Sequence, residues 1–276
     1  MNSFTKLICR LRKRKESCVH LSLEDDLHPL NSWDRDVDVY YLPTDRCRSN
    51  IFGYINDKNP FIETLHAFAD GNRSYALSLL TNYYEHCCPR SMADVLNIKS
   101  EIMEKIHPMA TVLPWWGITH DNKLKRSCID PVAEKLLSRE AYKLGLKPGI
   151  DYGWQYFGPA SKLLCELEFK RLVDVYQSIE KNGYNTARFG HIHGQFLLTK
   201  HRWVWVNVGG KHRFAALVAL GYKNIPVAAK FKPFVSSLCV RRDEVESWHN
   251  VRNGLFKYQE ALQVFDKMVD GQSWEQ

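Results

Sequence analysis

One stretch of the chain, from Trp203 to Val227, constrains the fold more than any other part of the 276-residue sequence. It opens with aromatic and β-branched residues, WVWVNV, which are typical of a buried strand. Gly209 and Gly210 interrupt the strand, because glycine takes positive φ freely and lets the backbone approach another group closely. Apolar residues follow at helical spacing until Gly221, which is expected to end the helix before a second strand, IPV. This order predicts an α/β unit.

The glycine loop has the chemistry of an anion site. A helix that begins here presents unpaired backbone N–H groups, and its dipole favours negative charge. Cationic side chains follow directly, and arginine can pair with phosphate through two hydrogen bonds. The predicted phosphate-binding set is therefore Gly209, Gly210, Lys211, His212 and Arg213. A tight strand-to-helix turn with exposed basic residues is the alternative interpretation.

Charge and cysteine content limit the classes of function. The net charge is +7, but six of the 38 basic residues lie within residues 1–15, which contain no acid. The remaining 32 basic and 31 acidic residues nearly cancel, so the body of the chain does not resemble a basic DNA-binding surface. The eight cysteines show no CxxC spacing, which favours reduced thiols in a cytoplasmic protein. No signal peptide is visible, and no apolar run approaches the roughly 18–20 residues that cross a bilayer.

Residues 1–15 form a basic amphipathic segment. Phe4, Leu7, Ile8 and Leu11 would share one side of a helix, with cations around them. Such a segment can bind an anionic membrane surface, with each basic residue contributing about 1 kcal/mol. Peripheral membrane contact and a solvated tail are both compatible with this pattern.

Residues 16–149 are predicted to form an α-rich N-terminal region. A short strand is expected over 37–42, and two helices separated by a glycine turn are expected over 61–87. Further helices are expected over 99–106 and 131–146. Residues 150–235 form the α/β part, and a C-terminal extension, polar up to Gly254 and then helical, is expected to pack back onto the body over 236–276.

Several further residues are candidates for the wall or rim of a pocket. Trp115 and Trp116 follow a proline directly, and so large a pair of rings is either a core plug or a ligand-pocket wall. His191 and His193 would share one face of a strand, but no third metal ligand accompanies them, so a structural or solvent-facing role at the rim is favoured. Asn207 is the one polar residue in its apolar strand and is expected to face the glycine loop.

The α/β part resembles a known superfamily. A helix over 166–181, two strands, GGKHRFAA at 209–216 and LGYKNIPV at 220–227 are similar to the ParB/sulfiredoxin pattern. That pattern reads Asp-Gly-x-His-Arg, a helix, Leu-Gly and Ile-Pro-Val, and the likeness covers about residues 165–230. Flanking segments resemble those of uncharacterised ParB-domain proteins met in bacterial surface-polysaccharide gene clusters; they are Pro60-Phe61, Val112–Trp116, Gly158-Pro159 and Val251–Leu255. The resemblance implies a mixed α/β (α+β) sheet with helices.

The resemblance also implies nucleotide phosphates at the glycine loop. Sulfiredoxin carries a catalytic cysteine just before the His-Arg pair, and Gly210-Lys211 stands there in this chain, so that activity is disfavoured. ParB partition proteins continue into a helix-turn-helix domain, whereas one helix is predicted after the likeness ends. Relatives that phosphorylate free serine carry a glutamate base on the preceding helix, where Glu166 and Glu168 are the candidates, with Arg171 on the same face as Glu168. A glutamate stabilised by the helix dipole is the alternative for either one.

These features favour a nucleotide-dependent kinase that uses ATP or another nucleotide with Mg²⁺. The expected acceptor is the hydroxyl of a sugar or an amino-acid-like molecule, in surface-polysaccharide synthesis. Gly209 stands where the relatives carry an acid, so the catalytic arrangement is expected to differ from theirs. A non-catalytic nucleotide-sensing or scaffold protein is the second interpretation, and a ParB-like DNA-binding or nuclease protein is the third and least supported by charge.

Overall fold

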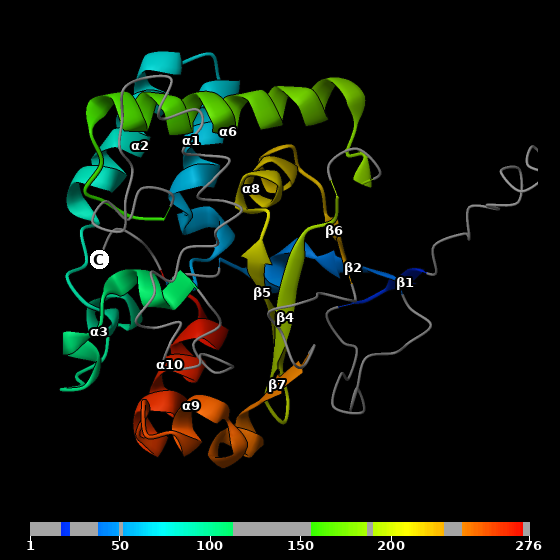
Figure 1. The fold of residues 1–276 in the computed structure, drawn as a ribbon. Helices are drawn as coiled ribbons and strands as arrows, with labels where there is room; N and C mark the ends of the chain where they lie inside the picture. Colours follow the sequence, from blue (N-terminus) through cyan, green and yellow to red (C-terminus); the bar gives the residue numbers. More distant parts are fainter. Residues whose placement is uncertain are drawn as a thin grey trace, which may run out of the picture.

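The structure is a computed structural model that describes residues 18–22, 38–49, 52–112, 156–186, 190–228 and 239–272. Figure 1 shows the arrangement of its helices and strands. Three features predicted from the sequence lie outside these residues: the basic segment 1–15, the Trp115-Trp116 pair and the helix over 131–146.

Two mixed sheets form the centre of the molecule. The first has the strand order β1-β2-β6, formed by Cys18–His20, Val39–Pro43 and Asn224–Ala228. The second has the order β3-β5-β4-β7, formed by Cys47–Arg48, Trp203–Gly209, His193–Leu198 and Cys239–Arg241. Both sheets contain parallel and antiparallel pairs, so the predicted mixed α/β class is confirmed. The finer ParB/sulfiredoxin assignment remains a prediction.

The helices begin where the sequence offers capping groups. Asn59 and Asn72 each accept a hydrogen bond from a first-turn N–H of the helix that follows, and Ser91 forms a capping box with Asp94. The described helices are α1 (Pro60–Ala69), α2 (Arg73–His86), α3 (Met92–Leu96), α6 (Lys162–Asn182), α8 (Lys211–Ala219), α9 (His249–Arg252) and α10 (Tyr258–Asp270). None of them is long and apolar enough to span a membrane.

Two sequence-based expectations about local structure were wrong. The helix expected over 99–106 is only a 3-10 turn at Met103–Lys105, because so short a run before Pro108 cannot offset the cost of helix nucleation. The stretch expected to be polar loop up to Gly254 contains strand β7 and helix α9. β7 is only three residues long, too short for its own sequence pattern to predict a strand. Its strand conformation is stabilised by pairing with β4.

The four-stranded sheet separates two hydrophobic cores. Alternation along β5 places Trp203 and Trp205 in one core, with α1, α2, α6 and α8, and places Val204 and Val206 in the other, with α3 and α10. Figure 1 shows these two helical layers on opposite sides of the sheet. Strands from the predicted N-terminal region (β2 and β3) pair with strands of the α/β part, so both regions contribute to the same sheets.

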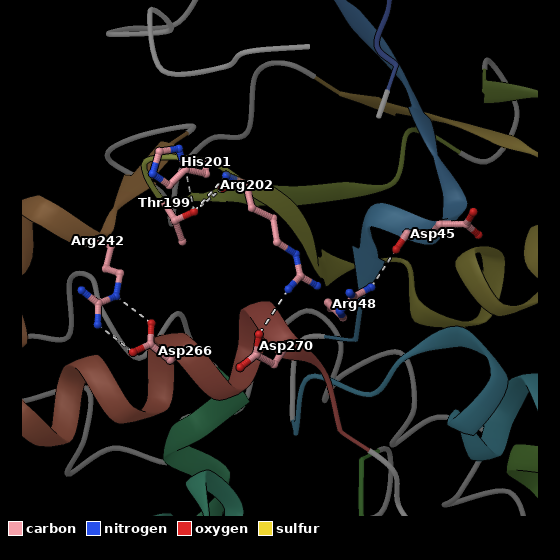
Figure 2. Close-up of polar contacts among 8 residues, drawn as sticks. All are labelled: Asp45, Arg48, Thr199, His201, Arg202, Arg242, Asp266 and Asp270. Atoms are coloured by element: carbon pink, nitrogen blue, oxygen red, sulfur yellow. Dashed lines mark hydrogen bonds and ion pairs between the residues drawn. The ribbon is translucent and has the colours of Figure 1, made fainter. Parts of the chain in front are cut away.

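Ion pairs attach the C-terminal helix to the sheet (Figure 2). Arg242 follows β7 and makes two hydrogen bonds with Asp266 of α10, at 2.7 and 2.8 Å. Arg202 directly precedes β5 and contacts Asp270 at the end of the same helix, with Nη1 3.2 Å from Oδ1. Phe265 and Trp248 are buried in the hydrophobic core that also contains Val204 and Val206 of β5.

Gly194 of β4 packs closely against β5, and its replacement by alanine is a test of this fold. An added Cβ would lie well inside 3.0 Å of the Val206 carbonyl oxygen and the Trp205 ring. Because both neighbours belong to the central strand, Gly194→Ala is expected to lower the free energy of unfolding by about 1–3 kcal/mol. Urea unfolding checks this value, and Gly209→Ala is the control, since its nearest atom would be 3.8 Å away. Equal stabilities would contradict the packing described.

Candidate functional site

The glycine loop has the predicted strand–loop–helix geometry. β5 ends at Gly209, and Gly210 is the N-cap of α8 in the left-handed conformation, with φ of 88°. An added Cβ on Gly210 would lie 2.8 Å from Nη2 of Arg213, because the guanidinium packs against its Cα. Gly209 has neither constraint. A side chain at position 210 would therefore strain the backbone and displace the tip of the Arg213 side chain.

Beneath this loop lies a buried carboxylate surrounded by basic side chains. Glu168 of α6 is 2% exposed, and its Oε1 lies 2.7 Å from Nε2 of His212 and 2.8 Å from Nζ of Lys211. Its other oxygen, Oε2, accepts a hydrogen bond from Nη1 of Arg171 at 3.0 Å. The structure thus joins four of the sequence-predicted residues into one cluster across α6 and α8.

Aromatic rings enclose the lysine of this cluster. Nζ of Lys211 lies 4.3 Å from the centre of the Phe61 ring in α1 and 5.0 Å from that of Tyr156. The Phe61 ring also packs edge-on against His212, with ring centres 6.2 Å apart. These contacts are favourable cation–π interactions, and they turn the ammonium group inward. Lys211 is therefore held between Glu168 and two rings.

The surroundings set the protonation states of the cluster. Burial would raise the pKa of Glu168, but Lys211, His212 and Arg171 together hold it well below its ordinary range. Burial lowers the pKa of Lys211 to about 8, although Glu168 opposes this shift. Burial also lowers the pKa of His212, and Lys211 and Arg171 add to that effect. At neutral pH the cluster therefore holds one anion, a neutral imidazole and two cations, a surplus of positive charge.

Arg213, His193 and Asn207 complete the neighbourhood of the loop. Nη1 of Arg213 donates to the carbonyl of Gly190 at 2.7 Å. His193 pairs with Gly209 across the β4–β5 ladder, and burial, Arg213 and His191 lower its pKa to about 4. Asn207 is 2% exposed, and no described residue bonds its Nδ2. Asn207 lies two residues after Trp205 in β5, on the same face of the strand and closer to the glycine loop.

One sequence-predicted residue, Glu166, stays apart from this site, and the structure adds others. Glu166 is exposed on α6, because a spacing of two residues places it on a different helix face from Glu168. Phe61 and Tyr156 were not linked to Lys211 by any sequence signal, since they come from distant segments. Tyr84 of α2 is fully buried with its hydroxyl unbonded by the described residues, and Glu168 contributes to its raised pKa.

Nothing in the described part of the chain forms a cage for a metal ion. No group of three or more His, Cys, Asp or Glu side chains lies together there.

Comparisons with protein-family models, with curated proteins and with solved structures found no match for this chain. The function is therefore argued from the geometry and chemistry of the cluster itself.

Proposed function

We propose that this protein is a nucleotide-dependent phosphotransferase of the ParB/sulfiredoxin type. It would bind nucleotide phosphates at Gly209–Arg213 and transfer a phosphoryl group to a hydroxyl of a sugar or amino-acid-like acceptor. The observation that carries the proposal is the position of Glu168, a buried carboxylate in contact with His212 and Lys211 directly beside the loop.

Four features support binding of an anion at this place. The cluster carries surplus positive charge, and the first turn of α8 presents N–H groups without intrahelical partners. The guanidinium of Arg213 lies close to Gly210, at the start of that turn. The buried amide of Asn207 has a donor that no described residue uses. A buried donor without a partner costs about 1–3 kcal/mol, so a ligand that accepts from it is favoured.

The inward direction of Lys211 changes the role expected for it. Because its ammonium group contacts Glu168 and two rings, its positive charge acts on a phosphate at longer range. Direct contacts with phosphate then fall to Arg213 and the backbone of the loop.

A buried acid–imidazole pair supports catalysis as well as binding. Phosphoryl transfer depends on positioning, on neutralising charge and on a group that accepts the acceptor's proton. Glu168 and His212 supply that chemistry within hydrogen-bond distance of each other. Bound Mg²⁺–nucleotide would supply the phosphoryl group and neutralise part of its charge. We propose a cytoplasmic location, with the basic segment 1–15 as a candidate membrane contact.

Calorimetric titration with Mg²⁺–ATP and Mg²⁺–CTP tests the binding step. The wild type is expected to bind at least one of them, and Arg213→Ala to weaken binding about 10- to 100-fold, because hydrogen bonds to charged groups contribute about 1.5–3 kcal/mol. Arg252→Ala is the control, since Arg252 is exposed on α9 in the opposite helical layer. No binding by the wild type, or equal binding by Arg213→Ala, would disprove the proposal.

A non-catalytic nucleotide-sensing protein is the second candidate, because Lys211, His212 and Arg171 together hold the pKa of Glu168 low and make it a weak base. The two functions differ in one measurement. Steady release of phosphate, or transfer to an added hydroxyl acceptor, excludes a purely sensing role.

A further inference from the structure

The electrostatics of the cluster argue against Glu168 as the group that takes the acceptor's proton. A general base works best when its pKa lies near the working pH. The pKa of Glu168 lies far below that range, because protonating the carboxylate would weaken its contacts with Lys211, His212 and Arg171. Its two buried oxygens are already occupied by these three side chains, so neither is directed to an incoming hydroxyl.

His212 has the properties that Glu168 lacks. Its Nε2 lies 2.7 Å from Oε1 of Glu168, and a carboxylate accepts, so Nε2 carries the proton of the neutral ring. The lone pair then resides on Nδ1, to which the described residues supply no hydrogen bond. Nδ1 is the ring nitrogen nearer the backbone, which for His212 is the first turn of α8. The side chain is 13% exposed rather than sealed.

We propose that His212 is the proton acceptor of the reaction and that Glu168 is a positioning residue that fixes the imidazole in its Nε2–H form. This inference rests on the proposed phosphotransferase function. In this arrangement the histidine transfers the proton and the buried carboxylate orients the histidine ring.

The step balances without any further reactant. The acceptor hydroxyl oxygen forms a bond to phosphorus as the bond between phosphorus and the leaving nucleoside diphosphate oxygen breaks. The hydroxyl proton passes to Nδ1 of His212 and from there to solvent. Glu168 keeps its negative charge throughout and stabilises the imidazolium that forms.

The surroundings of His212 favour the neutral ring, which can accept a proton. Glu168 and Arg171 face it from α6, Lys211 lies beside it on α8, and the Phe61 ring of α1 covers one side. Burial and the two cations outweigh the carboxylate, so the pKa of His212 lies below 6.5. The base form is thus present at neutral pH, and turnover should fall only as the pH drops through that lowered pKa.

Nitrogen NMR of ligand-free, histidine-labelled protein tests the arrangement independently of activity. At pH 7 the His212 ring, assigned by its loss in His212→Gln, is expected to be neutral with the proton on Nε2. A ring protonated on Nδ1, or charged at pH 7, would overturn the inference whatever the protein binds.

Turnover measurements test the role in the reaction. His212→Gln can keep a donor near Glu168 but has no group that accepts a proton at neutral pH. With Mg²⁺–ATP or Mg²⁺–CTP and water, N-acetylglucosamine or free serine as acceptor, its kcat is expected to fall about 100-fold or more, with nucleotide affinity within a few-fold of wild type. The acidic limb of the kcat–pH profile is expected to disappear. His201→Gln is the control, because His201 lies in the exposed turn between β4 and β5. This variant is expected to keep the wild-type kcat and the acidic limb of the pH profile.

The outcomes separate the two proposals. A wild type that neither binds nor turns over either nucleotide contradicts the phosphotransferase function and the inference with it. A wild type that turns over, beside a His212→Gln variant with undiminished kcat, overturns the inference alone. An acidic limb that vanishes in His193→Gln instead would assign the proton to His193.

Discussion

Replacement of Glu168 by leucine is expected to lower the free energy of unfolding by about 3 kcal/mol or more. Removing one partner of a buried ion pair leaves the other charge unpaired, at a cost of about 3–5 kcal/mol. Here Lys211, whose side chain is 23% exposed, would lose its counter-ion, and Arg171 would lose its partner on α6. Urea unfolding of the wild type and of Glu168→Leu measures the difference.

A double-mutant cycle isolates the pair. In Glu168→Leu with Lys211→Met, both charges are gone, so part of the lost stability is expected to return, and the coupling energy to exceed about 1 kcal/mol. The control is Asp174→Ala, which removes an exposed ion pair with Lys170 on the same helix and should cost less than about 1 kcal/mol. A loss in Glu168→Leu no larger than that of this control would contradict the buried cluster.

The pH dependence of stability offers a second test of the same cluster. The folded pKa of Glu168 is lower than its unfolded value, so the unfolded state binds more protons as the pH falls. The contribution of Glu168 is therefore fully present above its ordinary value of 4.5 and is lost progressively below it. This acid-dependent loss is expected in the wild type and should be smaller in Glu168→Leu.

The sequence predicted the loop well because its geometry is local. Gly210 needs a left-handed conformation, and the residues after it define a helix by their own spacing. The pairing of Glu168 with the loop was accessible only through the resemblance to the ParB/sulfiredoxin pattern. Glu168 lies 42 positions before Gly210, and spacing cannot show that two such segments meet. Its separation from Glu166 does follow from helical periodicity.

The aromatic enclosure of Lys211 could not be predicted in this way. Phe61 lies on α1 and Tyr156 precedes α6, and only the packing of these helices on the sheet brings them together. The same is true of β2 and β3, which come from the region predicted to be mainly helical and pair with strands more than 150 residues away. Periodicity identifies an element and its buried face, but the partner of that face depends on long-range packing.

Gly210→Ala is expected to weaken nucleotide binding about 30- to 150-fold, which corresponds to about 2–3 kcal/mol. The added methyl group would lie 2.8 Å from Nη2 and 3.2 Å from Cζ of Arg213, so the guanidinium must leave its place on the loop. A displaced arginine loses its charge-assisted hydrogen bonds to phosphate, and the altered loop backbone misaligns the N–H groups of the first turn of α8. Calorimetry with Mg²⁺–ATP and Mg²⁺–CTP measures the change.

Gly221→Ala separates this effect from simple backbone strain. Gly221 ends the same helix with φ of 78°, close to the 88° of Gly210, so alanine at either position costs a similar amount of stability, about 1–2 kcal/mol. No atom lies within 4 Å of a Cβ added at Gly221, however, and the Arg213 side chain stays in place. Both variants should therefore lose stability, and only Gly210→Ala should lose affinity. Equal affinities in the two variants would show that the packing of Arg213 on Gly210 does not serve the ligand, and would place phosphate binding elsewhere on the chain.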